Sequence, residues 1–430
     1  MRLNTPWFYG WNIVGIAIAY QAITYGIAIY GFTFWVPYWE TEFDAGRGVI
    51  MLIFMSIQIG MAVFAAFAGR AADRLPVRWL VMAGGFLFAS GLVLSAYARE
   101  LWQIGLIFSL TLVAGLLLAG SITAQTVTAR WFDRNAGLAL GIVSTGSSIG
   151  GLLLPMLIVY LQSTHGWREA NLWLAGLVIV VITPACLFLQ DKPKNAESGE
   201  ADRLSEDSGA STRQDRCRCQ GQDQDRGQAQ GQGQGQGQEW TFRDILMSWS
   251  FWSLALSFTV ISAVFIAIQQ NLAPLALDNN IDAMKVSTVI ALMAFVMIGA
   301  KLLFGFLSDR MNIRALFVSA CGALAVVLLL LTTSAITYTT LMVTAALVGF
   351  AAACSMPLSA SIIRRDFGAR SFGRVKGLMY TVLALGAAGP WIAGTIYDAT
   401  GGYETAWIVL GALLIPAIVA SSGFAGKAAK

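Results

Sequence analysis

Long apolar segments separated by short polar breaks recur along the whole chain of 430 residues. Each segment is close to the roughly 20 residues that an α-helix needs to cross the hydrocarbon core of a bilayer. We place twelve spans, at residues 11–35, 49–68, 79–97, 101–128, 136–161, 169–189, 249–277, 286–307, 315–333, 338–362, 373–396 and 404–424. The pattern predicts an all-α membrane protein with twelve transmembrane helices in two pseudo-symmetric six-helix bundles.

One motif occurs twice in the polar breaks, and its second copy follows the first by 236 positions. The two copies contain Gly69, Asp73, Arg74 and Arg78, and Gly305, Asp309, Arg310 and Arg314. The same offset relates further glycines, Gly137 to Gly373, Gly141 to Gly377, Gly150 to Gly386 and Gly166 to Gly402. A constant register over about a hundred residues indicates a duplicated membrane unit with parallel halves, an architecture typical of transporters.

A polar stretch separates the sixth and seventh spans and ends in a Gln-Gly repeat at residues 227–238. Such a sequence has no apolar surface to bury, which predicts a flexible linker over 191–248. It divides the chain into bundles at 1–190 and 249–430. The linker is interpreted as a tether, and the alternative is a regulatory or partner-binding tail.

Composition agrees with lipid as the solvent of this chain. It is 57% hydrophobic and 12% charged, whereas a soluble domain has roughly 25% charged residues. Four of its 28 Lys and Arg residues fall in the breaks on one side, namely Arg47, Arg99, Arg168 and Lys285. Because cytoplasmic loops are enriched in Lys and Arg, we expect both termini and the central loop in the cytoplasm, with the spans in the inner membrane.

The sequence offers no support for an enzyme, since it shows no nucleophile–base set, phosphate loop or ATP-binding cassette. The net charge of +4 follows from this topology and is not a sign of nucleic-acid binding. Cys217 and Cys219 form a Cys-x-Cys pair without nearby partner ligands, so we expect no metal or cofactor. Transport would then be driven by gradients.

Lys301 is the leading candidate for a site residue. It is the only charged residue of the apolar run 286–307, and helix geometry places it roughly 13 Å from the cytoplasmic end. A charge at that depth costs about 2.5–3.5 kcal/mol even on the lenient insertion scale, and intramembrane charges usually mark substrate paths. A cation without a carboxylate partner needs an anion, which a substrate supplies. The alternative is that Lys301 extends toward the interface or contacts a backbone carbonyl.

Further polar residues fall in the spans. Gln269, Gln270 and Asn271 form a cluster before Pro274, and Gln125 and Tyr380 lie in the fourth and eleventh spans. Each of these side chains can hydrogen-bond an anion or a neighbouring helix, and the sequence leaves both open. Glycines concentrate in the fifth and eleventh spans, which predicts either close static packing or helices that slide and bend.

The repeated motif has the chemistry of a conformational latch. Gly69 and Gly305 permit close approach of helix ends, while the aspartates and arginines can pair across an interface that breaks in a second state. The two copies resemble the repeated loop motif of the major facilitator superfamily, and the layout of two sets of six spans matches it over nearly the whole chain.

Three further places resemble a narrower group. They are Tyr9-Gly10-Trp11, the run from Arg130 to Gly141, and the segment from Gly373 through Gly389-Pro390 to Tyr397-Asp398. Together they are similar to the monocarboxylate porter and oxalate–formate antiporter group. The resemblance implies a secondary carrier of a small organic anion, above all a monocarboxylate, working by alternating access.

The resemblance also implies roles for single residues. In that group an arginine that binds the substrate carboxylate stands four positions before the motif glycine, and Lys301 occupies this place. Tyr25 aligns with a substrate-site tyrosine of the first helix. The lysine and acid that the animal porters use in proton coupling fall at Ile29 and Met297, so proton symport by that pair is not expected.

Two alternatives stay open. Within transport, the protein is an exchanger or exporter of dicarboxylates or other organic anions. From another class, it is a non-transporting sensor that signals through the central loop. We expect the organic anion and the lipid bilayer as partners, protons as the candidate coupling ion, no nucleic acid, and a monomer.

Overall fold

The computed structural model describes residues 9–132, 136–189, 241–308 and 310–421, and these residues form helices without any strand. The first bundle contains α1 (Gly10–Tyr25), η1 (Gly26–Tyr30), η2 (Phe32–Phe34), α2 (Val36–Phe43), α3 (Arg47–Arg74), α4 (Val77–Ala96), α5 (Leu101–Ile107), η3 (Phe108–Leu112), α6 (Val113–Leu118), α7 (Ser121–Trp131), α8 (Ala136–Ser144) and α9 (Gly146–Phe188). After the short α11 (Phe242–Met247), the second bundle contains α12 (Trp249–Asp278), α13 (Ala283–Ser308), α14 (Ile313–Thr333), α15 (Tyr338–Ala353), α16 (Ser355–Leu383), η4 (Ala384–Ala387), α17 (Ala388–Thr400) and α18 (Glu404–Ala420).

The number of membrane crossings follows from these helices. Ten segments of the described chain are long and apolar enough to cross a bilayer. One of them, Ala139–Phe188, has 50 residues and contains Gly166 with φ 77° and ψ 164°, a conformation that breaks a helix and reverses the chain. It therefore counts as two spans, and the apolar α18 completes a set of twelve. The predicted all-α fold with twelve transmembrane helices is confirmed.

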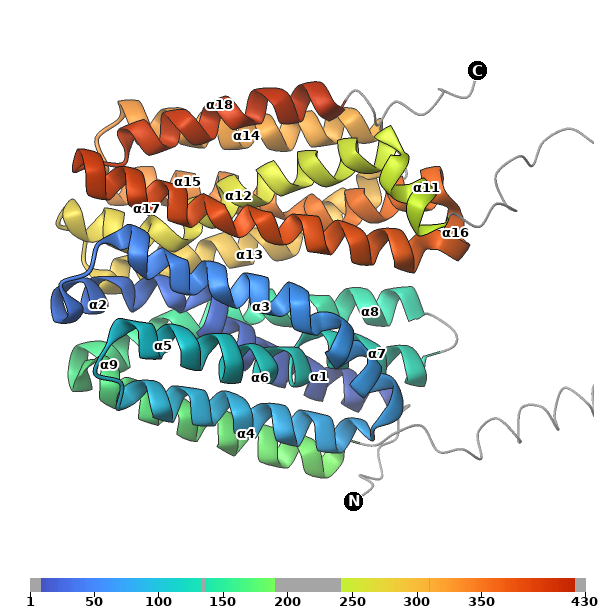
Figure 1. Cartoon of the computed structure of the whole chain (residues 1–430), viewed down its shortest axis with the longest axis horizontal. Coiled ribbons are helices and arrows are strands. Elements are labelled where there is room, and N and C mark those ends of the chain that lie inside the picture. The colour runs from blue at the N-terminus through green and yellow to red at the C-terminus, as the bar shows by residue number, and fades with distance from the viewer. Residues whose placement is uncertain (1–8, 133–135, 190–240, 309, 422–430) are drawn as a thin grey trace, which may run out of the picture.

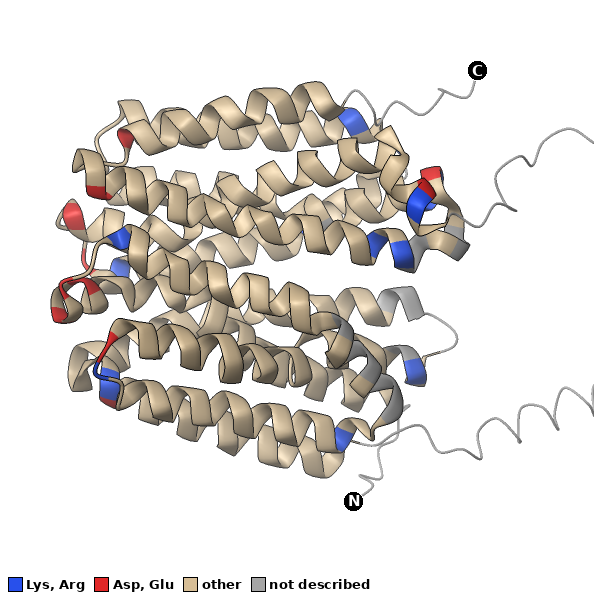
Figure 2. Cartoon of the chain, in the orientation of Figure 1, with Lys and Arg blue, Asp and Glu red and all other residues tan. Residues whose placement is uncertain are grey.

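The two bundles lie side by side with their helices roughly aligned (Figure 1). They meet along two seams, where α3 packs against α17 and α9 packs against α13. Charged residues gather at the two ends of the helices, and the band between the ends is almost free of them (Figure 2). Large apolar side chains such as Phe86, Val180 and Leu302 are exposed in that band, as expected for a surface covered by lipid.

Two spans deviate from the continuous helices that the sequence predicts. The first span contains a five-residue π-helical turn, η1, and the fourth is divided into α5, η3, α6 and α7. The break before α7 lies at Gly120, where a Cβ atom would meet the carbonyl oxygen of Leu116. The π turn matters for the site because its extra residue brings side chains five positions apart, Tyr25 and Tyr30, onto nearly one face.

Parts of two predictions lie outside the described residues. The linker at 191–248 is described only from residue 241, where a capping box between Thr241 and Asp244 begins α11. Of the latch residues, the surroundings of Gly69, the side chains of Asp73 and Arg74, and the whole of Asp309 are likewise outside the described part. The arginines Arg78 and Arg314 are exposed, and the guanidinium of Arg310 lies 4.1 Å from the centre of the Phe306 ring.

Candidate functional site

Lys301 joins the two bundles inside the membrane band. Its Nζ donates a hydrogen bond to the Ser148 hydroxyl on α9 at 2.9 Å. Lys301 is about 10 Å from the last residue of α13, at 1.5 Å per helical residue. Within the described part of the chain no carboxylate pairs with its ammonium. The structure therefore gives this cation one neutral oxygen and no counter-charge.

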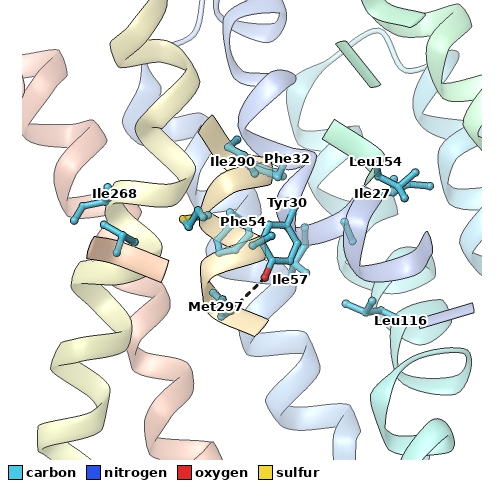
Figure 3. Packing of buried hydrophobic residues seen from close by; sticks show 14 of the residues in the cluster. Ile27, Tyr30, Phe32, Phe54, Ile57, Leu116, Leu154, Ile268, Ile290 and Met297 are labelled. Carbon is cyan, nitrogen blue, oxygen red and sulfur yellow. Dashed lines mark hydrogen bonds between the residues drawn. The ribbon is translucent and has the colours of Figure 1, made fainter. Parts of the chain in front are cut away.

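Two more polar groups surround this contact. Met297, one helical turn before Lys301 on α13, accepts weak hydrogen bonds at its sulfur from Ser148 and from Tyr30, at 3.7 and 3.6 Å. Figure 3 shows the Tyr30 hydroxyl directed at Met297. Ser148 and Tyr30 belong to the first bundle, whereas Met297 and Lys301 belong to the second. The centre of the molecule is thus a polar patch built from both bundles.

Tyr25 and Tyr380 extend this patch. The Tyr25 hydroxyl is 3.1 Å from that of Ser121 at the start of α7, and it interacts electrostatically with both Tyr30 and Tyr380. Tyr380, on α16 of the second bundle, is 43% exposed, so it borders open space.

The cluster on α12 divides between two environments. Gln270 donates from Nε2 to the Ile29 carbonyl of the first bundle at 2.9 Å, next to Tyr30, and its buried Oε1 has no hydrogen-bond partner among the residues that the structure describes. Asn271 is fixed by the Tyr403 hydroxyl, 3.1 Å from Oδ1, and by the Ala267 carbonyl. Gln270 consequently faces the centre with an unused acceptor, while Asn271 belongs to a neighbouring network.

Gln125 is the predicted site residue with the least structural definition. It is partly buried on α7 and forms no hydrogen bond with the described residues. The described residues contain no group of three or more His, Cys, Asp or Glu side chains placed to hold a metal ion.

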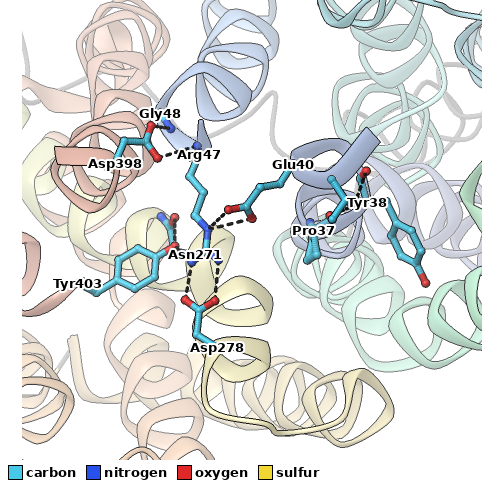
Figure 4. A network of polar contacts seen from close by, with 10 residues as sticks. Pro37, Tyr38, Glu40, Arg47, Gly48, Asn271, Asp278, Asp398 and Tyr403 are labelled. Carbon is cyan, nitrogen blue, oxygen red and sulfur yellow. Dashed lines mark hydrogen bonds and ion pairs between the residues drawn. The ribbon is translucent and has the colours of Figure 1, made fainter. Parts of the chain in front are cut away.

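A second polar cluster, which sequence analysis did not single out, surrounds Arg47 at the start of α3 (Figure 4). Arg47 begins α3, is 5% exposed and forms a two-pronged ion pair with Asp278 of α12, with N–O distances of 2.6 and 2.7 Å. Glu40 of its own bundle and the Tyr403 hydroxyl of the other also contact the guanidinium. Because Tyr403 also holds Asn271, this cluster reaches into the bundle interior.

A surface groove among the described residues does not resemble a site for a charged solute. It lies between α3 and α5 and has walls that are almost entirely apolar, with exposed Leu52, Trp102 and Leu106. Its hydroxyls on Ser56 and Ser109 hydrogen-bond to each other.

Comparisons with known proteins agree with this geometry. A family model of the Major Facilitator Superfamily matches residues 16–388 and 271–426. Monocarboxylate transporter 11 of Mus musculus is 26% identical over 421 residues, which are 95% of this chain and 85% of that protein. Monocarboxylate transporter 12 of Rattus norvegicus is 24% identical over 418 residues, 95% of this chain and 83% of that protein.

Among solved structures, a bacterial homologue of the human lysosomal transporter Spinster has the same fold. That structure, in an inward-facing and unoccupied conformation, matches with a TM-score of 0.70 and 15% sequence identity over 98% of both chains. The family model covers most of this sequence, and the curated relatives align with nearly all of it. This chain therefore belongs to the Major Facilitator Superfamily of membrane transporters and resembles its monocarboxylate transporter group.

Proposed function

We propose that this protein is a secondary active carrier that moves a small organic anion, most favourably a monocarboxylate, across the cytoplasmic membrane by alternating access. The observation that carries the proposal is the position of Lys301. Its ammonium lies within a membrane span, between the bundles, with a serine hydroxyl as its hydrogen-bond acceptor and no described carboxylate beside it. A bound carboxylate would supply the missing negative charge.

The arrangement suggests how binding and movement are linked. In the empty carrier, Ser148 satisfies one of the three N–H donors of the Lys301 ammonium. A substrate carboxylate accepting from the remaining donors, and from the Tyr30 hydroxyl, neutralises the cation. Enclosing the site would bury an uncompensated charge when it is empty and a neutral pair when it is occupied. Occupation therefore favours the movement of one bundle against the other.

The single cation favours a singly charged substrate. The Lys301 ammonium supplies one positive charge, so a monocarboxylate bound to it gives a neutral pair, whereas a dicarboxylate brings a second negative charge that this ammonium does not compensate. The relatives named monocarboxylate transporters support the same class. A lysine binds as a point charge rather than as a bidentate fork, so several small acids can fit.

Coupling and orientation belong to the same proposal. In the family that this chain resembles, an acid one helical turn before the substrate-binding cation pairs with a lysine of the first helix in proton coupling. Here these two positions are Met297 and Ile29, so a coupled proton would have to take another route. Both termini lie on the cytoplasmic side, because twelve spans return the chain to the side where it started and the Lys and Arg residues favour that side. The carrier works as a monomer, since both bundles of its site come from one chain.

Uptake by reconstituted protein tests this function. Vesicles containing the purified carrier should accumulate at least one labelled acid from a panel of formate, acetate, lactate, pyruvate and oxalate, with saturation kinetics. Repeating the assay with and without an inward proton gradient, and with unlabelled acid preloaded, separates symport, uniport and exchange. Protein-free vesicles are the control. Absence of saturable uptake for every acid would contradict the assignment of an organic anion.

Deletion of residues 200–238 separates a carrier from a sensor that signals through the linker. We expect the shortened protein to transport with an unchanged KM and with a rate within about twofold of wild type, because a sequence so rich in Gln, Gly and charged residues, with Leu204 as its one large aliphatic residue, is predicted to be a tether. Equal amounts of protein in the vesicles are verified by quantitative blotting. Loss of uptake, with normal amounts of folded protein, would show that the linker takes part in the mechanism.

A further inference from the structure

We propose that Arg47, Asp278 and Asp398 form a bridge that holds the two bundles together at one end, and that this bridge must open whenever the Lys301 site is exposed there. We name these three residues the Arg47 bridge. The inference deepens the alternating-access mechanism proposed above and rests on it. It adds the groups that close one of the two access paths, at the end opposite to Arg314.

The side chains of the bridge make a strong contact between bundles. Two guanidinium nitrogens of Arg47 donate to the two carboxylate oxygens of Asp278 in a parallel pair, and bidentate pairs of this kind are stronger and more specific than single hydrogen bonds. The guanidinium also lies 3.9 Å from the centre of the Tyr397 ring of the second bundle. Arg47 is nearly fully buried, while the Asp278 side chain is 31% exposed, so the guanidinium is shielded from water and the acid is reached by it from one side.

The backbone contributes a second contact of another kind. Asp398, on α17, accepts hydrogen bonds from the backbone N–H groups of Arg47 and Gly48 at 2.9 and 2.8 Å. These two N–H groups lie in the first turn of α3. The N-cap residue of this helix, Gly46, has no side chain that could accept their hydrogen bonds. A carboxylate of the second bundle thus caps a helix of the first, and its charge is favourable at a helix N-terminus.

Glycines allow the helices to come this close. A Cβ atom at Gly48 would lie 2.7 Å from the Thr395 hydroxyl oxygen, and one at Gly394 would lie 2.9 Å from the carbonyl carbon of Arg47. Both distances are shorter than ordinary contacts of a Cβ atom. The sequence at the start of α3 and along α17 therefore permits a closed seam that larger residues would prevent.

The internal repeat shows that the bridge is specific to this seam. Asp278 stands 236 positions after Glu42, and each acid lies at the end of the corresponding helix of its bundle. Glu42 is satisfied within its own bundle by Arg168, at 2.6 Å. The position equivalent to Arg168 in the second half is Glu404, another acid. Asp278 consequently takes its cation from the other bundle.

The bridge is also connected with the centre of the molecule. Arg47 donates to the Tyr403 hydroxyl, which donates to Asn271. The next residue, Gln270, holds the Ile29 carbonyl beside Tyr30. Asn271 and Gln270 are adjacent on α12, so this helix links the Arg47 cluster to the first bundle beside Tyr30, and a shift of α12 at one end has a physical route to the other.

Distance measurements between the bundles test the bridge. Spin labels are attached to cysteines introduced at the exposed Thr41 and Asn279, in a chain whose Cys217 and Cys219 are serine. The remaining cysteines, Cys186, Cys321 and Cys354, are buried and do not react. In vesicles without substrate we expect a short distance between the two spin labels when the bridge is unmodified. Arg47→Gln should shift the distribution of label-to-label distances to longer values.

Arg168→Gln is the matched control, because it removes an ion pair at the same end whose two partners lie in one bundle. It should leave the distances unchanged. If Arg47→Gln fails to fold, Asp278→Asn, which keeps the side-chain shape, gives the same comparison. A distribution identical to wild type in a folded bridge variant would overturn the inference. The readout requires no knowledge of the solute, so failure of the uptake panel and failure of the bridge are separate outcomes.

Discussion

Lys301→Gln is expected to abolish saturable uptake of the carboxylate substrate or to raise its apparent KM at least tenfold. A hydrogen bond to a charged group contributes about 1.5–3 kcal/mol, and each 1.4 kcal/mol corresponds to about a tenfold change in affinity. Glutamine retains a similar length and one donor group toward Ser148 but removes the positive charge. The loss should therefore be specific to anion binding and should leave the fold intact.

Initial uptake rates over a range of substrate concentrations provide the measurement, with Lys301→Arg and Lys285→Gln alongside. Lys301→Arg keeps the charge and should keep measurable uptake. Lys285 is an exposed lysine on the same helix, and its substitution should have no effect. If the carrier with Lys301→Gln transports with the same KM and maximal rate as wild type, the anion site lies elsewhere.

Lys301 and the membrane spans could be predicted from the sequence because both are local properties. A span is visible as a run of apolar residues, and a charge inside such a run is conspicuous without knowledge of its neighbours. The boundaries agree closely as well. The span placed at 286–307 is α13, Ala283–Ser308, and the span placed at 315–333 is α14, Ile313–Thr333.

Ser148 and Tyr30 could not be recognised as neighbours of Lys301, because their positions depend on which helix faces meet. Ser148 is one of several hydroxyl residues in its span, and nothing in its local sequence distinguishes the one that faces α13. Tyr30 is five positions after Tyr25, a separation that puts side chains on different faces of a regular α-helix. The π turn that unites them leaves no reliable pattern in the sequence.

Arg47 was interpreted from the sequence only as a cation in a loop, since counting charges does not show whether a side chain is buried. One signal could have revealed it. In the repeat register, Glu42 has a cation at Arg168, whereas Asp278 has an acid, Glu404, at the equivalent place. An acid without its cation implies a partner elsewhere, and the structure identifies that partner as Arg47.

Gly150→Ala is expected to lower the thermal stability of the carrier markedly and to reduce uptake with it. A Cβ atom at Gly150 would lie 2.1 Å from the carbonyl oxygen of Ala22 on α1, and backbone atoms cannot move aside as a flexible side chain can. Relieving the clash requires α1 and α9 to separate, and overpacking of this kind costs about 1–3 kcal/mol. The measurement is the unfolding temperature of the purified protein in detergent, beside initial uptake rates.

Gly141→Ala is the matched substitution, because it makes the same chemical change in the neighbouring α8 where nothing lies within 4 Å of the added atom. Alanine also has the higher helix propensity, so this variant should be as stable as wild type or slightly more stable. Equal unfolding temperatures for the two variants would show that the contact between α1 and α9 yields easily. A selective effect at Gly150 would instead mean that close packing fixes α9, and with it the position from which Ser148 reaches Lys301. The glycines of the fifth span would then act first in static packing, and sliding of α9 along α1 would not be needed to explain them.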